Sequence, residues 1–445
     1  MELQHRLGDQ RFTRDRPAPP RHWNRGRHDL LLRIAPRYLS RPWRTLMRMT
    51  RLLAIALLMT VAAGAFAADW PIWRGPTQDG IAPDTGINKD WNGQPPAKLW
   101  QVEMHDGGYA GPSMADGKVF IIDHVGAQDV VRALDIATGQ EVWSFAYDDL
   151  QKANYGFSRS TPIYDGGRLY TVSFLGNVGC LNAETGELIW GINMPGKFGG
   201  RVPTWGYAMS ALIDGDRLVL VPGGPNACVA TVDKMTGEVL WMGGGGDIAG
   251  YSTPVKATIQ GTEQYVVFTG KSVIGVRAED GELLWRVPWE TAYDVNAATP
   301  IVAGDHVFIT SNYKRGCAII AVGPDGADIH WETQTMSSHF NTPVFHEGYF
   351  YGTGNPSLMC LSPSDGQAVW TQSGFENGGV VMVDGVILAL SGNQGFMAMV
   401  EATPEGYREL GRFTPLGGQS WTAPIVADGK LIVRNKEALA CFDLM

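Results

Sequence analysis

Short apolar runs alternate with polar turns along most of the chain, and the clearest example is ALDIATGQEVW at Ala133–Trp143. One apolar run leads into this stretch and a second ends at its Trp, as expected for two successive β-strands. Thr-Gly or Asp-Gly lies between the runs. These residues suit a tight turn, because Gly tolerates a positive φ and Asp or Thr caps its own turn. The pattern therefore predicts β-hairpins, and no long amphipathic helix is evident.

This strand–turn–strand unit recurs about every 39 to 51 residues. A small residue lies ten positions before a Trp, and a Gly four positions before it, in the copies that end at Trp143, Trp190, Trp241, Trp285 and Trp370. A looser copy ending at Trp331 has its Gly one place early, and a degenerate copy has Leu410 in place of the Trp. Self-similarity at this period is typical of propellers and solenoids. We expect each Trp to pack between blades, where the small residue of a neighbouring unit leaves room for its ring.

The two ends of the repeat region complete each other. Ala97–Met104 has the pattern of an outer strand carrying Trp100, whereas Leu431–Met445 gives middle strands and stops where an outer strand should begin. Pairing of these ends closes a ring and removes its exposed edges. Outer strands are then eight in number, at Trp100, Trp143, Trp190, Trp241, Trp285, Trp331, Trp370 and Leu410. The sequence predicts an all-β, eight-bladed β-propeller over residues 97–445, with an irregular Trp-, Pro- and Gly-rich segment, residues 68–96, lying on it.

The first 67 residues differ from the rest of the chain. Residues 1–48 hold twelve Arg and four acidic residues, and a short basic stretch then leads into an apolar run that ends in an Ala-x-Ala motif. We interpret residues 49–67 as a signal peptide cleaved after Ala67, and residues 1–48 as a leader upstream of a true start at Met47 or Met49. The rival interpretation of the leader is an Arg-rich nucleic-acid-binding arm. Because no Arg-Arg pair and no Cys accompany the run, we expect ordinary export, to the periplasm or as a secreted protein.

Removal of the first 67 residues changes the charge. Lys plus Arg falls from 36 to 23 and Asp plus Glu from 45 to 41, which leaves a net charge near −18. This balance argues against nucleic acid or an anionic membrane surface as the main partner. The five Cys form no CxxC, CxxCH or adjacent pair, so we expect no disulfide framework. We also expect a monomer with no transmembrane segment after signal cleavage.

The A-x-D-x-x-T-G-x-x-x-W unit resembles the repeat of the pyrroloquinoline quinone (PQQ) propeller superfamily. That superfamily includes quinoprotein alcohol dehydrogenases and BamB, the propeller lipoprotein of the outer-membrane barrel assembly machine. The resemblance covers residues 97–445, and the leading DWPIWRGPTQDG is similar to exported bacterial PQQ-repeat proteins. For the dehydrogenases, the resemblance implies PQQ on the channel axis above a vicinal disulfide, a calcium held by carboxylate and amide oxygens, and an Asp base.

The nearest match to such a calcium set is Glu290, Asp294 and Asn296, in WETAYDVNAATP. Oxygen ligands of this type suit Ca²⁺, and Asp294 is then the alternative for a catalytic base. Acidic and amide residues before a strand are also ordinary capping and turn chemistry. We therefore expect no metal, no catalytic residue and no cofactor, with PQQ and calcium as the alternative.

Candidate binding residues come from one face of the predicted ring. In a four-stranded blade, the connections between blades and the turns between second and third strands share a face, which we call the connector face. Just before the inner strands, it carries the candidates Tyr109, Arg159, Trp205, Tyr207, Tyr251, Asn296, His339, Asn341 and Trp421. Its other turns add the bases Lys271, Lys314, Arg315, Arg434 and Lys436. Such a ring suits an anionic or planar ligand; alternatively, the aromatics pack the channel mouth and the bases lie free in solvent.

These observations predict an exported, non-catalytic binding or scaffold propeller, similar to BamB, that acts on a protein or a small anionic ligand. The alternative is a PQQ-dependent alcohol or sugar dehydrogenase. The missing Cys pair and haem motif separate the two hypotheses, and both omissions favour the binding protein.

Overall fold

The computed structural model describes residues 69–150, 155–354 and 356–445. The expected leader (residues 1–48) and signal peptide (residues 49–67) lie outside the described residues. Within the described part, no helix has the length and apolar character needed to cross a membrane.

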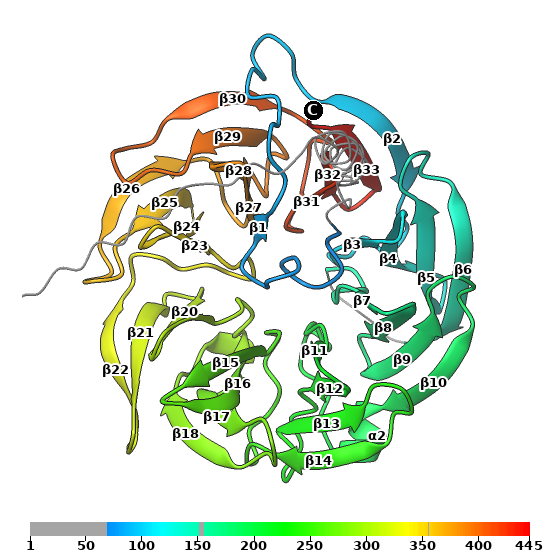
Figure 1. Ribbon diagram of the computed structural model, residues 1–445, viewed down its shortest axis with the longest axis vertical. Helices are drawn as coiled ribbons and strands as arrows, with labels where there is room; N and C mark the ends of the chain where they lie inside the picture. Colours follow the sequence, from blue (N-terminus) through cyan, green and yellow to red (C-terminus); the bar gives the residue numbers. More distant parts are fainter. Residues whose placement is uncertain (1–68, 151–154, 355) are drawn as a thin grey trace, which may run out of the picture. The chain divides into compact units, whose positions relative to one another are not determined.

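Eight antiparallel sheets stand around a central axis, as predicted, and form a β-propeller (Figure 1). Blade 1 consists of β3 (Ser113–Ala115), β4 (Lys118–Val125), β5 (Gln128–Asp135) and β6 (Glu141–Asp148). Blade 2 consists of β7 (Ile163–Asp165), β8 (Arg168–Val172), β9 (Asn177–Asn182) and β10 (Leu188–Asn193). Blade 3 consists of β11 (Leu212–Asp214), β12 (Arg217–Leu220), β13 (Val229–Asp233) and β14 (Val239–Gly243). Blade 4 consists of β15 (Val255–Ile259), β16 (Thr262–Phe268), β17 (Ser272–Arg277) and β18 (Leu283–Pro288).

The second half of the ring repeats this arrangement. Blade 5 consists of β19 (Ile301–Ala303), β20 (His306–Ser311), β21 (Gly316–Gly323) and β22 (Gly326–Thr333). Blade 6 consists of β23 (Val344–His346), β24 (Tyr349–Thr353), β25 (Ser357–Leu361) and β26 (Ala368–Ser373). Blade 7 consists of β27 (Val380–Val383), β28 (Val386–Leu390), β29 (Met397–Glu401) and β30 (Glu409–Phe413). Blade 8 consists of β31 (Ile425–Ala427), β32 (Lys430–Arg434), β33 (Ala438–Asp443) and β2 (Ala97–Glu103). The short helices are α2 (Met194–Phe198) and the 3₁₀ turn η1 (Ala292–Asp294).

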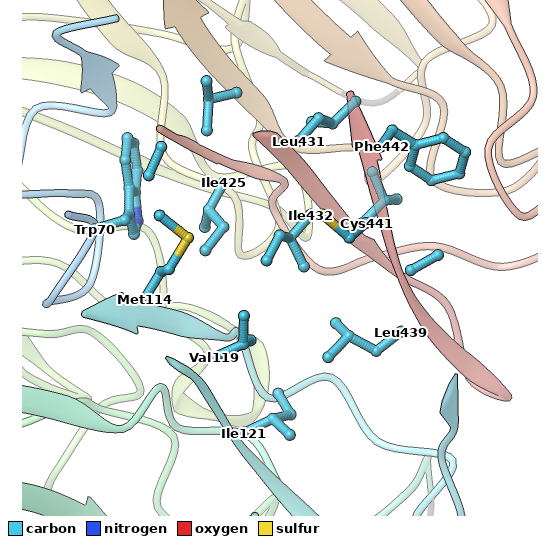
Figure 2. Close-up of a cluster of buried hydrophobic side chains, with 14 of the residues drawn as sticks. Trp70, Met114, Val119, Ile121, Ile425, Leu431, Ile432, Leu439, Cys441 and Phe442 are labelled. Atoms are coloured by element: carbon cyan, nitrogen blue, oxygen red, sulfur yellow. The ribbon is translucent and has the colours of Figure 1, made fainter. Parts of the chain in front are cut away.

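Closure of the ring by the N-terminal strand is confirmed. Strand β2 pairs antiparallel with β33, and Trp100 lies opposite Cys441. The side chains of β31 to β33 face those of β3 and β4 in one apolar cluster, with Trp70 and Met114 at one end of it (Figure 2). The N-terminal strand thereby completes the last blade, and blades 8 and 1 share one apolar core.

Five of the seven outer-strand Trp residues pack on the turn glycine of the next blade. Trp143 of blade 1 donates its indole N–H to the carbonyl of Ala183 in blade 2, at 3.0 Å. Its ring lies against the turn glycine Gly186, where a Cβ would come within 2.6 Å of Trp143. The same pairing joins Trp100 to Gly139, Trp190 to Gly237, Trp241 to Gly281, and Trp331 to Gly366. The small residue plays a different part from the one expected: Ala133 lies opposite Trp143 within its own blade.

Two exceptions follow the two irregular repeats. Trp285 precedes the looser copy, whose Gly is displaced, and it donates instead to Gln264 Oε1 of its own blade at 2.6 Å. Blade 7 carries Leu410 where the other repeats have Trp, and Trp91 from the N-terminal segment covers this position. Trp91 is 1% exposed and meets Phe413 edge-to-face at 5.0 Å. Trp91, which is distant in sequence, thus covers blade 7, whose repeat lacks the Trp.

Residues 69–96 cross one end of the central channel and contact several blades (Figure 1). Trp70 exchanges two backbone hydrogen bonds with Met114 of blade 1. The two-residue strand β1 (Ile81–Ala82) pairs parallel with β27 of blade 7. Between these points, Arg74 is 8% exposed, and its guanidinium donates to the carbonyls of Thr342 and Pro343 at the start of blade 6. This segment therefore plugs the channel.

Candidate functional site: an aromatic cavity on the connector face

A cavity of about 480 Å³ lies on the connector face, within the range of volumes that hold small-molecule ligands. Its walls come from the connections that lead into blades 1 to 6 and blade 8, and from the β20–β21 turn. Its floor includes Trp73 of the plug, whose indole N–H donates to the hydroxyl of Thr299 at 2.9 Å. Each wall residue is thus held by a loop anchored in a rigid blade, an arrangement typical of binding sites.

A Thr followed by Pro stands just before four of the inner strands, at Thr161, Thr253, Thr299 and Thr342. The backbone N–H of Thr161 donates to the hydroxyl of Ser210, and the N–H of Ser210 donates to that of Thr253, at 2.9 and 3.0 Å. Thr299 and Thr342 make the same bond at 2.8 Å between blades 5 and 6. These bonds join neighbouring blades where the inner strands begin.

Eight ring side chains follow one another around the cavity, each in contact with the next. They are, in order, Tyr155, Trp205, Tyr293, Tyr313, His339, Phe340, Trp421 and Tyr109, with successive centroids 4.6 to 6.3 Å apart. Tyr109 and Trp421 stack at 5.1 Å with planes 22° apart, whereas Tyr155 and Trp205 meet edge-on at 76°. Both arrangements are favourable for aromatic pairs. The result is a nearly continuous aromatic wall.

Three of these tyrosines adopt a left-handed backbone. Their φ angles are 65° at Tyr155, 60° at Tyr293 and 57° at Tyr313. A bulky residue in this region costs about 1 kcal/mol or more, and such strain gathers at functional sites. The first two side chains are 60% and 61% exposed, so they stand at the rim of the cavity. Strain and exposure together make the rim a candidate contact surface.

Arg159 supplies the only permanent charge among the described residues that line the cavity. Its guanidinium donates to the carbonyl of Gly156 at 3.3 Å and lies 5.5 Å from the centre of the Phe174 ring. Burial lowers the pKa of Arg159, but an arginine stays protonated at neutral pH. Burial also raises the pKa of Tyr109 to about 12 and lowers the pKa of His339, so both are neutral at pH 7. The cavity is therefore cationic at one place on its wall.

Seven of the nine candidate residues line this cavity: Tyr109, Arg159, Trp205, Tyr251, His339, Asn341 and Trp421. Tyr207 and Asn296 are not brought to it. Tyr207 is fully buried and donates its hydroxyl to the carbonyl of Pro222, and Asn296 is fully buried between β16 and the loop before η1.

Sequence reasoning missed Trp73, Tyr155, Tyr293, Tyr313 and Phe340. Phe340 adjoins the candidate His339, and Tyr313 lies in a turn from which only the bases were chosen. A search for aromatic residues in every connector-face loop would have identified more of the cavity wall than the choice of residues before the inner strands did. Trp73 had no such signal, because the path of the plug across the channel depends on contacts far apart in sequence.

The five bases of the other turns do not line the cavity. Arg434 is 1% exposed and pairs with Asp106. Lys271 pairs with Asp294 at 2.8 Å. Arg315 lies 3.4 Å from the centre of the Trp289 ring, a cation–π contact. At least these three are engaged within the protein, so the alternative in which the bases lie free in solvent is wrong for them.

The alternative calcium set is not assembled. The side-chain oxygen of Asn296 accepts hydrogen bonds from the hydroxyls of Thr291 and Ser311, at 2.6 and 2.9 Å. Asp294 faces Lys271 instead of a shared point with Asn296. Within the described ranges, no three His, Cys, Asp or Glu side chains gather as metal ligands, and all five cysteines are buried and free. These residues do not fit calcium-bound PQQ.

Comparison with known proteins places the chain in a family. A family model described as outer membrane protein assembly factor BamB matches residues 127–372. BamB from Yersinia pestis is 23% identical over 372 residues, which cover 77% of this chain and 87% of that protein. The crystal structure of BamB from Moraxella catarrhalis superposes with a TM-score of 0.56 at 13% identity, over 78% of this chain and 97% of that one.

The same fold occurs in an enzyme. The quinohemoprotein alcohol dehydrogenase ADHIIG from Pseudomonas putida HK5 superposes with a TM-score of 0.55 at 13% identity, over 85% of this chain and 80% of that one. Likeness at this identity shows the propeller and does not by itself assign an activity. The family model, in contrast, spans more than half of the sequence. The chain therefore belongs to the BamB family of PQQ-repeat β-propellers.

Proposed function

We propose that the protein is an exported, non-catalytic propeller that works by binding, with the aromatic cavity on the connector face as its binding site. The observation that carries this proposal is the aromatic wall around the half-buried Arg159, with a strained and exposed rim. Two of its relatives are named for outer membrane protein assembly, so we place it in the periplasm, where it would act as a scaffold for a protein partner or bind a small anionic ligand.

The chemistry of the cavity supports binding over catalysis. A general base must be within hydrogen-bond reach of the proton that it removes. Asp294, the alternative base, pairs with Lys271 outside the cavity lining. The hydroxyls of Ser210 and Thr253 are engaged in the bonds between blades. The lining instead offers flat apolar surface and a fixed cation, which suit recognition.

Site-specific photo-crosslinking in the native periplasm tests the binding face. A crosslinker at Tyr293 stands on the cavity rim, and one at Val369 on the outer strand of blade 6 serves as the control, since its side chain is 44% exposed. We expect adducts at Tyr293 and none at Val369. Adducts confined to Val369 would move the binding site to the outer edge of the ring.

A turnover assay tests the dehydrogenase alternative. The purified protein is given PQQ, Ca²⁺ and an artificial electron acceptor, with common alcohols and sugars as substrates. We expect no reduction of the acceptor, because the oxygen of Asn296 and the carboxylate of Asp294 are engaged elsewhere. Turnover that disappears in Asp294→Ala would establish the enzyme and overturn the binding proposal.

A further inference from the structure

A buried histidine–aspartate pair lies on the connector face at the turn between β4 and β5. His124 is near the end of β4 and Asp129 near the start of β5, and their side chains are 3% and 0% exposed. The imidazole Nδ1 is 2.8 Å from Asp129 Oδ1, and Nε2 is 3.2 Å from the carbonyl oxygen of Gly126. The hydroxyl of Tyr147 donates to the other oxygen of Asp129 at 3.4 Å. Both ring nitrogens of His124 therefore face oxygen atoms.

The partners of the ring show that the pair holds an additional proton. A carbonyl oxygen only accepts hydrogen bonds, so Nε2 must carry a hydrogen. A carboxylate also only accepts, so either Nδ1 carries a second hydrogen or the Asp129 carboxyl carries one. In both forms the pair has one proton more than a neutral imidazole beside a carboxylate. Loss of that proton leaves two lone pairs facing each other in a buried place, which costs free energy.

The surroundings of the pair favour this proton. Burial raises the pKa of the Asp129 carboxyl to about 7, and the charges of Asp149 and Asp106 act in the same direction, whereas the hydrogen bond to His124 opposes them. The other charged or titratable groups on the surrounding elements are Tyr147, His105, Asp123, Arg132 and Arg434. The pair therefore keeps its proton at pH values at which an exposed aspartate, with a pKa of about 3.9, has lost its own.

The same imidazole supports the rim of the cavity. The ring of Phe157 lies parallel to that of His124, with centroids 3.9 Å apart and planes 3° apart. Phe157 belongs to residues 155–160, which we call the rim segment and which carry the cavity residues Tyr155 and Arg159. A positive charge on the imidazole is attracted to the face of an aromatic ring, so the proton also strengthens this stack. The placement of the rim segment thus depends on how the His124 ring is held.

We propose that the His124–Asp129 pair is a proton-dependent support of the rim segment, which holds Tyr155 in the cavity wall below neutral pH and releases it as the shared proton is lost. This inference rests on the proposed function, since it makes binding at that face dependent on pH. One proton is linked to the supported arrangement. Each unit of pH above the transition therefore weakens that arrangement by up to about tenfold.

Fluorine NMR tests the contact directly, with 4-fluorophenylalanine at position 157. The resonance should shift with pH around a midpoint near 7, because the ring stacks on the titrating pair. The control carries the same probe at position 413, where Phe413 meets Trp91 and Phe442 edge-on and should not respond. A resonance at position 157 that does not move between about pH 6 and pH 8.5 would overturn the proposal.

The variant Asp129→Asn separates the proton from the hydrogen bond. The side-chain N–H of Asn donates to Nδ1, so both ring nitrogens keep partners without a shared proton. This variant should hold the rim segment throughout the same range of pH, and its resonance at position 157 should lose the transition near 7. His105→Gln is the control, because it removes an imidazole that is bonded to Asp123 of the same blade, and it should keep the wild-type transition.

Hydrogen exchange of residues 155–160 measures the release itself. At pH 8 the wild type should exchange roughly tenfold faster than Asp129→Asn, and at pH 6 the two proteins should exchange alike. Comparison at one pH cancels the intrinsic dependence of exchange on pH. Equal rates at pH 8 would contradict the proposal. If Asp129→Asn does not fold, the fluorine titration of the wild-type pair still decides.

Crosslinking at Tyr293 separates this inference from the proposed function. In periplasmic extract the yield of adducts should fall between pH 6 and pH 8 for the wild type and stay constant for Asp129→Asn. If the yield is equal at both pH values, the rim segment does not control binding, and the inference is wrong while the proposed function stands. If no adduct forms at either pH, the proposed function fails, and the titration at position 157 alone decides the proton-dependent contact.

Discussion

Arg434 and Asp106 form an ion pair in which both side chains are completely buried. Arg434 ends β32 in blade 8, and Asp106 follows β2, the strand that closes the ring. The guanidinium also donates to the carbonyl of Ala110 at 2.9 Å, just before blade 1. The ring is thus closed twice, by the β2–β33 ladder and by a buried charge pair that ties blade 8 to the connection into blade 1.

We expect Asp106→Asn to lower the free energy of unfolding by about 3–5 kcal/mol, because it leaves the Arg434 guanidinium buried without its counterion. Urea unfolding followed by tryptophan fluorescence measures the change. The double variant Asp106→Leu with Arg434→Met removes both charges and should recover much of the loss. A double variant less stable than Asp106→Asn would show that the pair contributes more than mutual compensation.

A second prediction concerns the contact between Trp143 and Gly186. Trp143→Ala should cost about 3–5 kcal/mol, the usual range for a buried Trp, since the ring is 9% exposed. Gly186→Ala places a methyl group 2.6 Å from that ring at a φ of 76°. Gly117→Ala is the matched control, because Gly117 has a φ of 70° but no atom within 4 Å of the added carbon.

Thermal and urea unfolding of the two glycine variants separate strain from packing. Gly117→Ala should show only the cost of a left-handed alanine, about 1–2 kcal/mol. Gly186→Ala should be clearly less stable than Gly117→Ala. Equal stabilities would mean that the Trp ring moves aside freely and contributes little to the joint between blades.

The third prediction concerns ring closure. Deletion of residues 69–103 removes β2 and exposes the edge of β33, and unpaired edges promote aggregation. Deletion of residues 69–94 removes most of the plug but keeps β2, so it is the matched control. Size-exclusion chromatography with light scattering should show aggregates for the first variant and a mainly monomeric second variant. A monomeric, folded first variant would show that β2 is dispensable.

The sequence predicted the fold well because the strand–turn–strand unit of each blade is repeated along the chain. At five blade joints the Trp of one repeat touches the turn Gly of the next repeat, so the recurrence of both residues reports a real contact. The missing outer strand at one end and the lone strand at the other specified closure. The role of the small residue was misjudged because a cross-strand neighbour, such as Ala133 for Trp143, and a neighbour in the next blade have similar sequence signatures.

The site was harder to predict than the fold. The loops before the inner strands were correctly identified as the source of the cavity wall, but direction within a loop depends on backbone angles. Tyr293 reaches the rim because its backbone has a left-handed φ, and the neighbouring residues in the sequence do not predict this backbone angle. Arg434 was expected in solvent because its partner Asp106 lies 328 positions away. Long-range pairing of this kind has no local pattern.

The last prediction concerns pH. Burial lowers the pKa of His339, which meets Tyr313 edge-on and stacks on Phe340. An unfolded histidine titrates near 6.5. Below that pH the imidazole is protonated in the unfolded chain but stays neutral in the folded protein, so the free energy of unfolding decreases. The free energy of unfolding is therefore unaffected by His339 above about pH 6.5. It decreases as the pH falls below that value toward the lower pKa of the folded state.

The variant His339→Gln cannot take up this proton, so its stability should fall less between pH 7 and pH 5 than that of the wild type. His306→Gln, at an exposed position on blade 5, is the control for the loss of an imidazole outside the cavity. Urea unfolding at half-unit steps of pH gives the comparison, and proton NMR of the imidazole should place the midpoint of His339 below 6.5. If the His339→Gln and wild-type curves run parallel, the imidazole titrates alike in the folded and unfolded chains. The cavity wall at His339 would then be open to water instead of desolvated.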